Sequence, residues 1–165
     1  MTDPLTVQPL TRTAFAPFGQ VIETDGHTAQ SINQGHSMRF GELADLDITR
    51  ENGAPTLSIF RSKPLPWPLV LHQMERHRLG SQAFIPLSGR NWLLMVAPPG
   101  DFVRDQIRAF LATGQQGVNF TAGTWHHFSL ALNAVSDFLV IDRSETGVDC
   151  EEVTLEPPIT IEALL

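Results

Sequence analysis

Two short segments carry most of the side chains that could do chemistry. In the first, "ERHRLGSQ", Glu75 and His77 are two residues apart and Gln82 opens the next apolar run. Residues i and i+2 of a β-strand lie on the same face, so Glu75 and His77 are expected to point the same way. In the second, "TAGTWHHF", a Gly-Thr turn precedes His126 and His127. Neighbouring strand residues point to opposite faces, so one of these two histidines must face the interior.

Together these side chains could hold a metal ion. Carboxylate oxygen, imidazole nitrogen and amide oxygen suit a borderline divalent ion such as Ni²⁺, Zn²⁺, Mn²⁺ or Fe²⁺. The candidate ligands are Glu75, His77, Gln82 and the inward one of His126 and His127. If no metal is bound, Glu75 or a histidine would have to act directly as a general acid or base. The catalytic candidates are therefore Glu75, His77 and the same inward histidine, which the resemblance described below identifies as His126.

Each of these residues also has an ordinary structural explanation. A single histidine on a strand is more often a hydrogen-bonded core or surface residue than a ligand. Glu75 could form a solvated pair with Arg76, Arg78 or Arg90, and such surface pairs contribute only about 0–1 kcal/mol. The order of the residues along the chain favours a shared site. Glu75-x-His77 is followed by Gln82 and Gly89, and a Gly-x-x-His pattern, from Gly123 to His126, comes later.

The elements that must position these side chains are short strands. The 12 prolines and 12 glycines divide the chain into apolar clusters that are too short for helices but long enough for strands. Short helices are expected after a Thr11 cap and over "DFVRDQ", both outside the sheet. The tail after residue 149 alternates apolar residues and is expected to form a peripheral strand or arm. Strands are predicted over residues 56–61, 69–77, 82–87, 91–97, 107–112, 117–121, 125–132 and 136–143, which indicates an all-β sandwich or barrel.

Chain length, net charge and cysteine content limit the classes of protein to which this sequence can belong. A chain of 165 residues is long enough for one well-filled core, so a single domain over residues 1–165 is expected. The formal charge of −7 argues against nucleic-acid partners. One cysteine, Cys150, cannot form an intramolecular disulfide, and no apolar run approaches a signal peptide or a membrane span. We therefore expect a soluble, cytoplasmic protein without membrane partners.

The spacing of the candidate ligands resembles the two motifs of the cupin superfamily. Those motifs read His-x-His, three or four residues, Glu, six residues, Gly, and later Pro-x-Gly-x-x-His. Here Glu75 stands at the first His, His77 at the second, Gln82 at the Glu and His126 at the last ligand. Two of the four usual ligands are therefore replaced. Gln82 is a neutral donor at the position where the usual motif has its carboxylate.

A longer resemblance is to the ureidoglycolate lyases of allantoin degradation, formerly called ureidoglycolate hydrolases. It rests on "LTRTAFAPFGQVIE", "INQGHSMRF", "ERHRLGSQAFIPL", "QQGVNFTAGTWHHFSLAL" and "DFLVIDR". The resemblance implies a cupin-type double-stranded β-helix, a homodimer, and an enzyme that splits (S)-ureidoglycolate into glyoxylate and urea. Nickel is the cofactor that it implies for some members. The divalent metal expected here is accordingly Ni²⁺ or a similar ion.

Such a substrate would need an anchor for its carboxylate. A planar guanidinium matches the two carboxylate oxygens, and Arg39 or Arg61 is expected to face the barrel mouth. Asn33, in a polar loop ahead of the sheet, could close over the site or reach a dimer partner. The predicted substrate-binding residues are therefore Arg39, Arg61, Gln82 and Asn33.

Two other functions are compatible with this sequence. One is a non-catalytic cupin that binds a small carboxylic acid as a sensor, since a fold does not fix an activity. The other is a different cupin metalloenzyme that acts on a small hydroxy acid.

Overall fold

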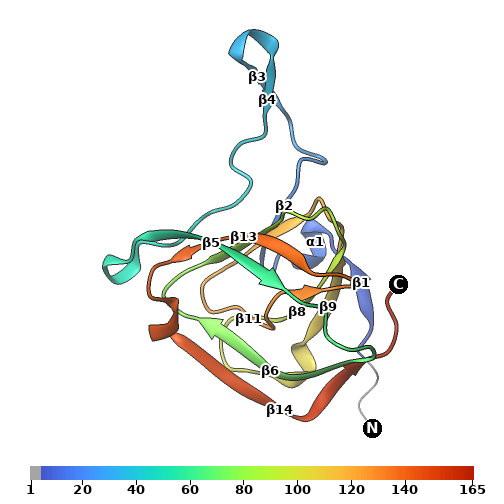
Figure 1. Cartoon of the computed structure of the whole chain (residues 1–165). Coiled ribbons are helices and arrows are strands. Elements are labelled where there is room, and N and C mark those ends of the chain that lie inside the picture. Colours follow the sequence, from blue (N-terminus) through green and yellow to red (C-terminus); the bar gives the residue numbers. More distant parts are fainter. Residues whose placement is uncertain (1–4) are drawn as a thin grey trace.

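Two β-sheets packed against each other make up the body of the protein, and a hairpin projects from it (Figure 1). The computed structural model describes residues 5–165. The seven-stranded sheet contains, in spatial order, β1 (Val7–Pro9), β9 (Arg108–Ala112), β8 (Trp92–Ala97), β11 (Trp125–His126), β6 (Leu69–His77) and β14 (Cys150–Ile161), with β12 (Leu130–Ala131) also paired to β8. The five-stranded sheet has the order β2 (Gly19–Ile22), β10 (Gly117–Phe120), β7 (Gln82–Pro86), β13 (Ser136–Arg143) and β5 (Pro55–Ser62).

The helices are short and lie outside the sheets. The first, α1 (Arg12–Phe15), begins at Thr11, whose hydroxyl accepts a hydrogen bond from the Ala14 backbone N–H, as the sequence predicts. The 3₁₀ turns are η1 (Asn33–Gly35), η2 (Arg50–Asn52), η3 (Arg104–Gln106) and η4 (Thr146–Val148). The turn η3 lies within the segment "DFVRDQ", where a short helix is expected.

Strand β8 contributes side chains to both hydrophobic cores of the protein. Its sequence "WLLMVA" has no polar residue because both of its faces are buried. One face packs between the two sheets, in an inter-sheet core that contains Phe84, Trp92, Leu94, Val96, Phe110, Val118, Phe120, Phe138 and Val140. The other face packs against β6 and β14, in an outer core that contains Leu69, Leu71, Met74, Leu93, Met95, Leu155 and Ile161.

The prediction of an all-β, cupin-type fold is confirmed. Strands β6 and β13 have the predicted bounds, and the tail is the edge strand β14, paired antiparallel with β6. The prediction of one strand over residues 125–132 is wrong, because this segment forms two separate strands, β11 and β12. His126 is paired with Val96 but Leu130 with Leu93, so one extra residue is accommodated between them. Such an insertion is a β-bulge, which interrupts a ladder and redirects side chains.

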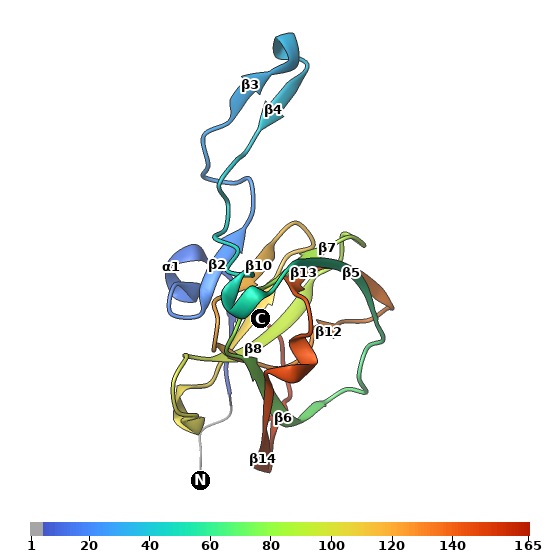
Figure 2. The same ribbon diagram turned by 90° about the vertical axis from the view of Figure 1, so that its left-hand side faces the viewer.

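Strands in the first part of the chain were not predicted. β1 and β2 are short and complete the edges of the two sheets. The polar loop around Asn33 proves to be the turn of a hairpin made by β3 (Gln30–Ile32) and β4 (Ser37–Arg39), with Asn33 and Gln34 at positive φ. Figure 2, turned by 90° from Figure 1, shows the same hairpin standing clear of both sheets.

Candidate active site and metal centre

Strand pairing brings the two chemical segments together. β11 lies between β6 and β8, and its residue His126 is directly opposite Glu75 of β6. At the end of β6 the carbonyl of His77 accepts a hydrogen bond of 2.7 Å from the backbone N–H of Gly123. Gly123 has a φ of +85°, which is costly for other residues, so glycine allows the turn that leads into β11. The two segments therefore meet through backbone hydrogen bonds.

Glu75, His77 and His126 form a compact cluster at the end of the inter-sheet core. The imidazole centroids of His77 and His126 are 5.7 Å apart, and Glu75 Oε1 lies 3.9 Å from His126 Nδ1. The three residues can each offer one ligand atom such that all three atoms lie within 4.8 Å of one another. This spacing is short enough for one divalent ion to contact all three after small side-chain adjustments.

His126 is buried and is held in a fixed orientation. Its ring stacks on Phe120 at a centroid distance of 4.4 Å and an interplanar angle of 4°. Its Nδ1 is 3.2 Å from the carbonyl oxygen of His127. If Nδ1 donates its proton to that carbonyl, the lone pair of Nε2 is left for a ligand. Burial, followed by the charge of His77, lowers the pKa of His126 to about 3, so the ring is neutral near pH 7 and able to bind a metal.

A second carboxylate faces His77. His77 Nδ1 and Asp149 Oδ1 are 3.8 Å apart, and both are buried without a hydrogen-bond partner among the described residues. The other oxygen of Asp149 accepts a hydrogen bond of 2.6 Å from the Leu79 backbone N–H. A carboxylate beside a histidine fixes the tautomer and raises the basicity of the other ring nitrogen. Sequence reasoning missed Asp149, because this residue reaches His77 only through the pairing of β14 with β6.

Gln82 is oriented by Asp142, another residue that sequence reasoning did not place in the site. The amide nitrogen of Gln82 donates a hydrogen bond of 3.0 Å to Asp142 Oδ2, so the amide oxygen must point the other way. That oxygen, Oε1, is buried and has no partner among residues 5–165. An unpaired buried acceptor is costly unless a ligand satisfies it. The cluster of Glu75, His77 and His126 therefore fits a divalent cation, and the unpaired oxygen of Gln82 is a further donor of a suitable type.

Glu75 also contacts the thiol of Cys150. Burial raises the pKa of Glu75, although the neighbouring His77 and the Cys150 hydrogen bond both oppose the shift. Cys150 donates to Glu75 Oε2 over 3.8 Å, and burial together with the charges of Glu75 and Glu152 raises the thiol pKa to about 11. Glu75, Cys150 and Glu152 could also surround an ion. The protonated thiol makes this second group the weaker binder, because thiolate is the form that ligates.

The other predicted substrate-binding residues lie elsewhere. Arg61 is 72% exposed and forms two hydrogen bonds of 2.8 and 2.9 Å with Asp137. It follows Phe60, whose ring packs on Phe84 of the inter-sheet core, so Arg61 lies on the outward face of β5. Arg39 ends β4, and Asn33 lies in the hairpin turn, where its side chain donates to Ser37 Oγ. The structure thus pairs Gln82 with Phe120, the residue on which His126 stacks, but places Arg61 on the outward face of β5 and Arg39 and Asn33 on the hairpin.

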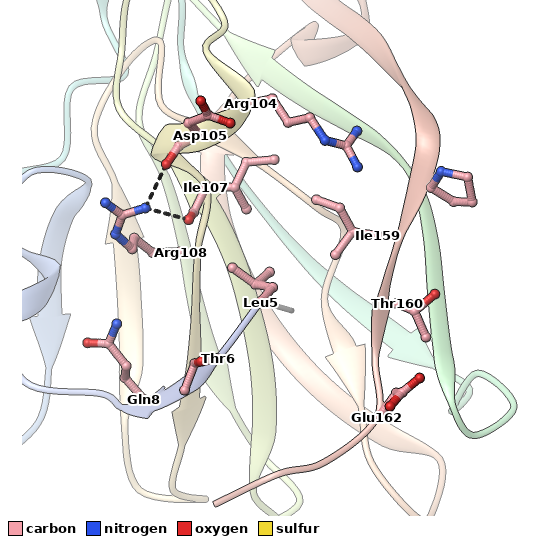
Figure 3. A pocket seen from close by; sticks show the side chains of 11 residues that line it. Leu5, Thr6, Gln8, Arg104, Asp105, Ile107, Arg108, Ile159, Thr160 and Glu162 are labelled. Carbon is pink, nitrogen blue, oxygen red and sulfur yellow. Dashed lines mark hydrogen bonds between the residues drawn. The ribbon is translucent and has the colours of Figure 1, made fainter. Parts of the chain in front are cut away.

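An open hollow lies on another part of the molecule. It has a volume of about 750 Å³ and is bordered by β1, by the segment from Arg104 to Arg108 and by the end of β14 (Figure 3). None of the predicted site residues lines it. The cluster of buried donors is the better candidate site, because convergent ligands and perturbed pKa values indicate chemistry more specifically than the size of an open hollow.

The low pKa of His126 predicts how the stability of the metal-free protein depends on pH. Below about pH 6.5 the unfolded chain binds a proton at His126, whereas the folded chain does not bind it until pH approaches 3. The free energy of unfolding should therefore fall as pH is lowered from 6.5 towards 3. In urea titrations between pH 7 and 4.5, His126→Gln should lose less stability than the wild type. Equal losses in the two proteins would contradict the assignment, and exposed His36→Gln serves as the control.

Comparison with known proteins places the chain in one family. The family model described as ureidoglycolate lyase matches residues 2–162. A protein named ureidoglycolate lyase from Burkholderia mallei (strain NCTC 10229) is 48% identical over 163 residues, which cover 98% of this chain and 96% of the relative. Proteins of the same name from Pseudomonas syringae pv. tomato and Azotobacter vinelandii are 50% and 49% identical over 149 residues, covering 90% of this chain and 88% and 90% of those relatives. Within the described residues no helix is long and apolar enough to cross a membrane. With a matching family model over almost its whole length and relatives near 50% identity, the chain belongs to the ureidoglycolate lyase family.

Proposed function

We propose that the protein is a lyase that splits (S)-ureidoglycolate into glyoxylate and urea, within the breakdown of allantoin. The single observation that carries this proposal at the site is the buried cluster of Glu75, His77 and His126, in a chain that belongs to the ureidoglycolate lyase family. The proposed catalytic residues are these three. The proposed metal ligands are the same three with Gln82, whose unpaired buried oxygen supports the assignment.

The reaction needs one proton to leave an oxygen and one to reach a nitrogen. Ureidoglycolate carries a hydroxyl and a urea nitrogen on the same carbon. When the O–H bond breaks, the oxygen electron pair forms the C=O bond of glyoxylate, the C–N bond breaks, and the nitrogen takes up a proton to give urea. A divalent ion held by Glu75, His77, Gln82 and His126 would polarise the hydroxyl oxygen and lower the pKa of that hydroxyl.

If no metal is bound, Glu75 is the proposed carrier of the proton. Burial raises its pKa, which brings the carboxyl closer to the operating pH and favours proton transfer in both directions. Its Oε1 faces His126, and its Oε2 accepts from Cys150, so one oxygen faces the histidine cluster while the other is held. The ring of His126 is neutral, and Asp142 holds the amide of Gln82 in one orientation, so both can act as fixed neutral donors.

Several finer assignments complete the proposal. Ni²⁺ is the proposed ion, because two imidazoles with carboxylate and amide oxygens match its donor preference. Arg39, Arg61 and Asn33 remain proposed contacts to the substrate carboxylate, which for Arg61 requires release from Asp137.

We further propose a cytoplasmic homodimer in which residues 1–165 form one domain. The free thiol of Cys150 supports a reducing compartment.

Product analysis tests the reaction itself. Purified protein incubated with (S)-ureidoglycolate should release glyoxylate and urea in equal amounts, with no ammonia. Both products and ammonia can be quantified in the same quenched sample. Ammonia as the nitrogen product would instead indicate a hydrolase, and absence of any turnover with Ni²⁺ added would contradict the proposed function.

A further inference from the structure

Three strands of the five-stranded sheet share a row of inward-facing residues near their ends. Gln82 of β7 is opposite Phe120 of β10 on one side and opposite Asp142 of β13 on the other. Directly opposite residues of an antiparallel pair lie on the same face, and Phe120 belongs to the inter-sheet core, so all three point inward. We call Phe120, Gln82 and Asp142 the inner row. Because Asp142 accepts from Gln82 and Phe120 stacks on His126, this row connects the sheet to the histidine cluster.

Each residue of the inner row has a neighbour in the chain that points the other way. These neighbours are Asn119, Ser81 and Arg143. Successive residues of a strand alternate between its two faces, so the neighbours are directed outward. All three are polar and yet buried, at 0%, 1% and 6% exposure. Buried polar groups are normally satisfied by hydrogen bonds, so their partners show what covers this side of the sheet.

All three neighbours bind one segment, residues 45–54, which we call the strap. Asn119 Nδ2 donates a hydrogen bond of 2.9 Å to the carbonyl of Asp45. Ser81 exchanges two hydrogen bonds with the backbone of Asp47, each of 2.8 Å, one through its hydroxyl and one through its own N–H. The first half of the strap is therefore attached to β10 and to the start of β7.

Arg143 holds the second half of the strap. Its guanidinium donates to the carbonyls of Arg50 and Glu51 over 3.0 and 3.2 Å. Glu51 and Asn52 have φ of +49° and +60°, a region that residues other than glycine adopt at a cost. A Cβ on Gly53 would overlap the Arg143 side chain, so the strap lies directly against it. The strap thus crosses the ends of β10, β7 and β13 in their spatial order.

The strap adds nothing to either hydrophobic core. It connects the hairpin to β5, and within this described segment no side chain is buried (Figure 1). A segment that buries no apolar side chain contributes little hydrophobic stabilisation. Its attachments are instead hydrogen bonds to three buried polar residues, each directly beside a residue of the inner row. The strap is therefore placed to fix the strand ends rather than to build the core.

We propose that the strap holds the inner row in place from outside the sheet, through three positioning residues. Asn119, Ser81 and Arg143 do not touch the reacting atoms. Each is joined to a residue of the inner row by one peptide unit, so a shift of the outward side chain moves the inward one. A displacement of about 1 Å can lower a rate about 100-fold. This inference rests on the lyase reaction and the metal site proposed above.

Arg143→Lys tests the proposal most directly. Lysine keeps the positive charge, but its single ammonium group lacks the planar fork that donates to two carbonyls. The affinity for Ni²⁺ and kcat/KM for ureidoglycolate should each fall at least about tenfold, because Gln82 and Asp142 lose their fixed positions. Titration calorimetry with Ni²⁺ and initial rates would be measured well below the thermal unfolding temperature. A variant that unfolds earlier but keeps both values while folded would show a merely structural role and overturn the proposal.

Ser81→Ala and Ser88→Ala form a matched pair at opposite ends of β7. Both hydroxyls accept a backbone N–H, Ser81 from Asp47 over 2.8 Å and Ser88 from Asp137 over 2.9 Å. Only Ser81 binds the strap. Ser81→Ala should lower kcat/KM about fivefold, whereas Ser88→Ala should stay within about twofold of the wild type. Equal effects of the two substitutions would contradict a specific role for the strap.

Hydrogen exchange followed by mass spectrometry tests the strap without any reaction. Peptides that carry the inner row should exchange at least about tenfold faster in Arg143→Lys than in the wild type, and at the wild-type rate in Ser88→Ala. Unchanged exchange in Arg143→Lys would overturn the proposal and leave the lyase reaction standing. If the wild type does not split ureidoglycolate, exchange still decides whether the strap holds the inner row, so the two failures are distinguishable.

Discussion

Replacing His126 with alanine is expected to lower kcat/KM for ureidoglycolate by about 10³-fold, within the range lost when a positioned acid–base or ligand group is removed. The ring is neutral and buried, stacks on Phe120 and lies opposite Glu75, so no solvent molecule can replace it in the same orientation. Initial rates of glyoxylate release would measure the effect. Near-normal activity would remove His126 from the site.

His127→Ala is the matched control for this experiment. The two histidines are neighbours, and both are buried, but the ring of His127 packs on Phe128 instead of Phe120. The backbone carbonyl of His127, which lies beside His126 Nδ1, remains in this variant. Activity within a fewfold of the wild type is expected. Circular dichroism and thermal unfolding of both variants would separate loss of chemistry from loss of fold.

Removal of metal by a chelator is expected to abolish activity, and added Ni²⁺ is expected to restore it. Glu75→Gln should lower the affinity for Ni²⁺ at least about 100-fold, because the only carboxylate among the proposed ligands becomes neutral while the other three donors are already neutral. Titration calorimetry and elemental analysis of the purified proteins measure this without an activity assay. Unchanged affinity in Glu75→Gln would exclude this donor set.

Glu152→Gln distinguishes the two possible ion sites that share Glu75. Glu152 is opposite Glu75 on β14 and belongs only to the group with Cys150. If the ion is bound by His77 and His126, Glu152→Gln keeps its metal content and activity, whereas His77→Ala loses both. The reverse pattern would move the ion to the Cys150 side. A pH–rate profile with and without chelator would then show whether Glu75 or a histidine acts without metal.

The local part of the fold was predictable from the sequence. Turn residues and short apolar runs gave β6 and β13 their correct bounds, because strand ends are set mainly by nearby glycine, proline and polar residues. β3 and β4 were not predicted, because they are short and polar and pair only with each other. The division of the predicted strand at His127 also escaped prediction, since a bulge depends on the register with β8 rather than on local sequence.

For the candidate site too, some relations follow from the sequence and others only from the tertiary structure. The sequence by itself determined that Glu75 and His77 share a face and that one of His126 and His127 must point inward, because the side-chain period of a strand is a local property. Only the tertiary structure decided that His126 is the inward one, that Asp142 holds Gln82 and that Asp149 faces His77. It also placed Arg61 on the outward face, paired with Asp137. These relations depend on which strands pair and in what register, and that pairing is set by the packing of residues far apart in the chain.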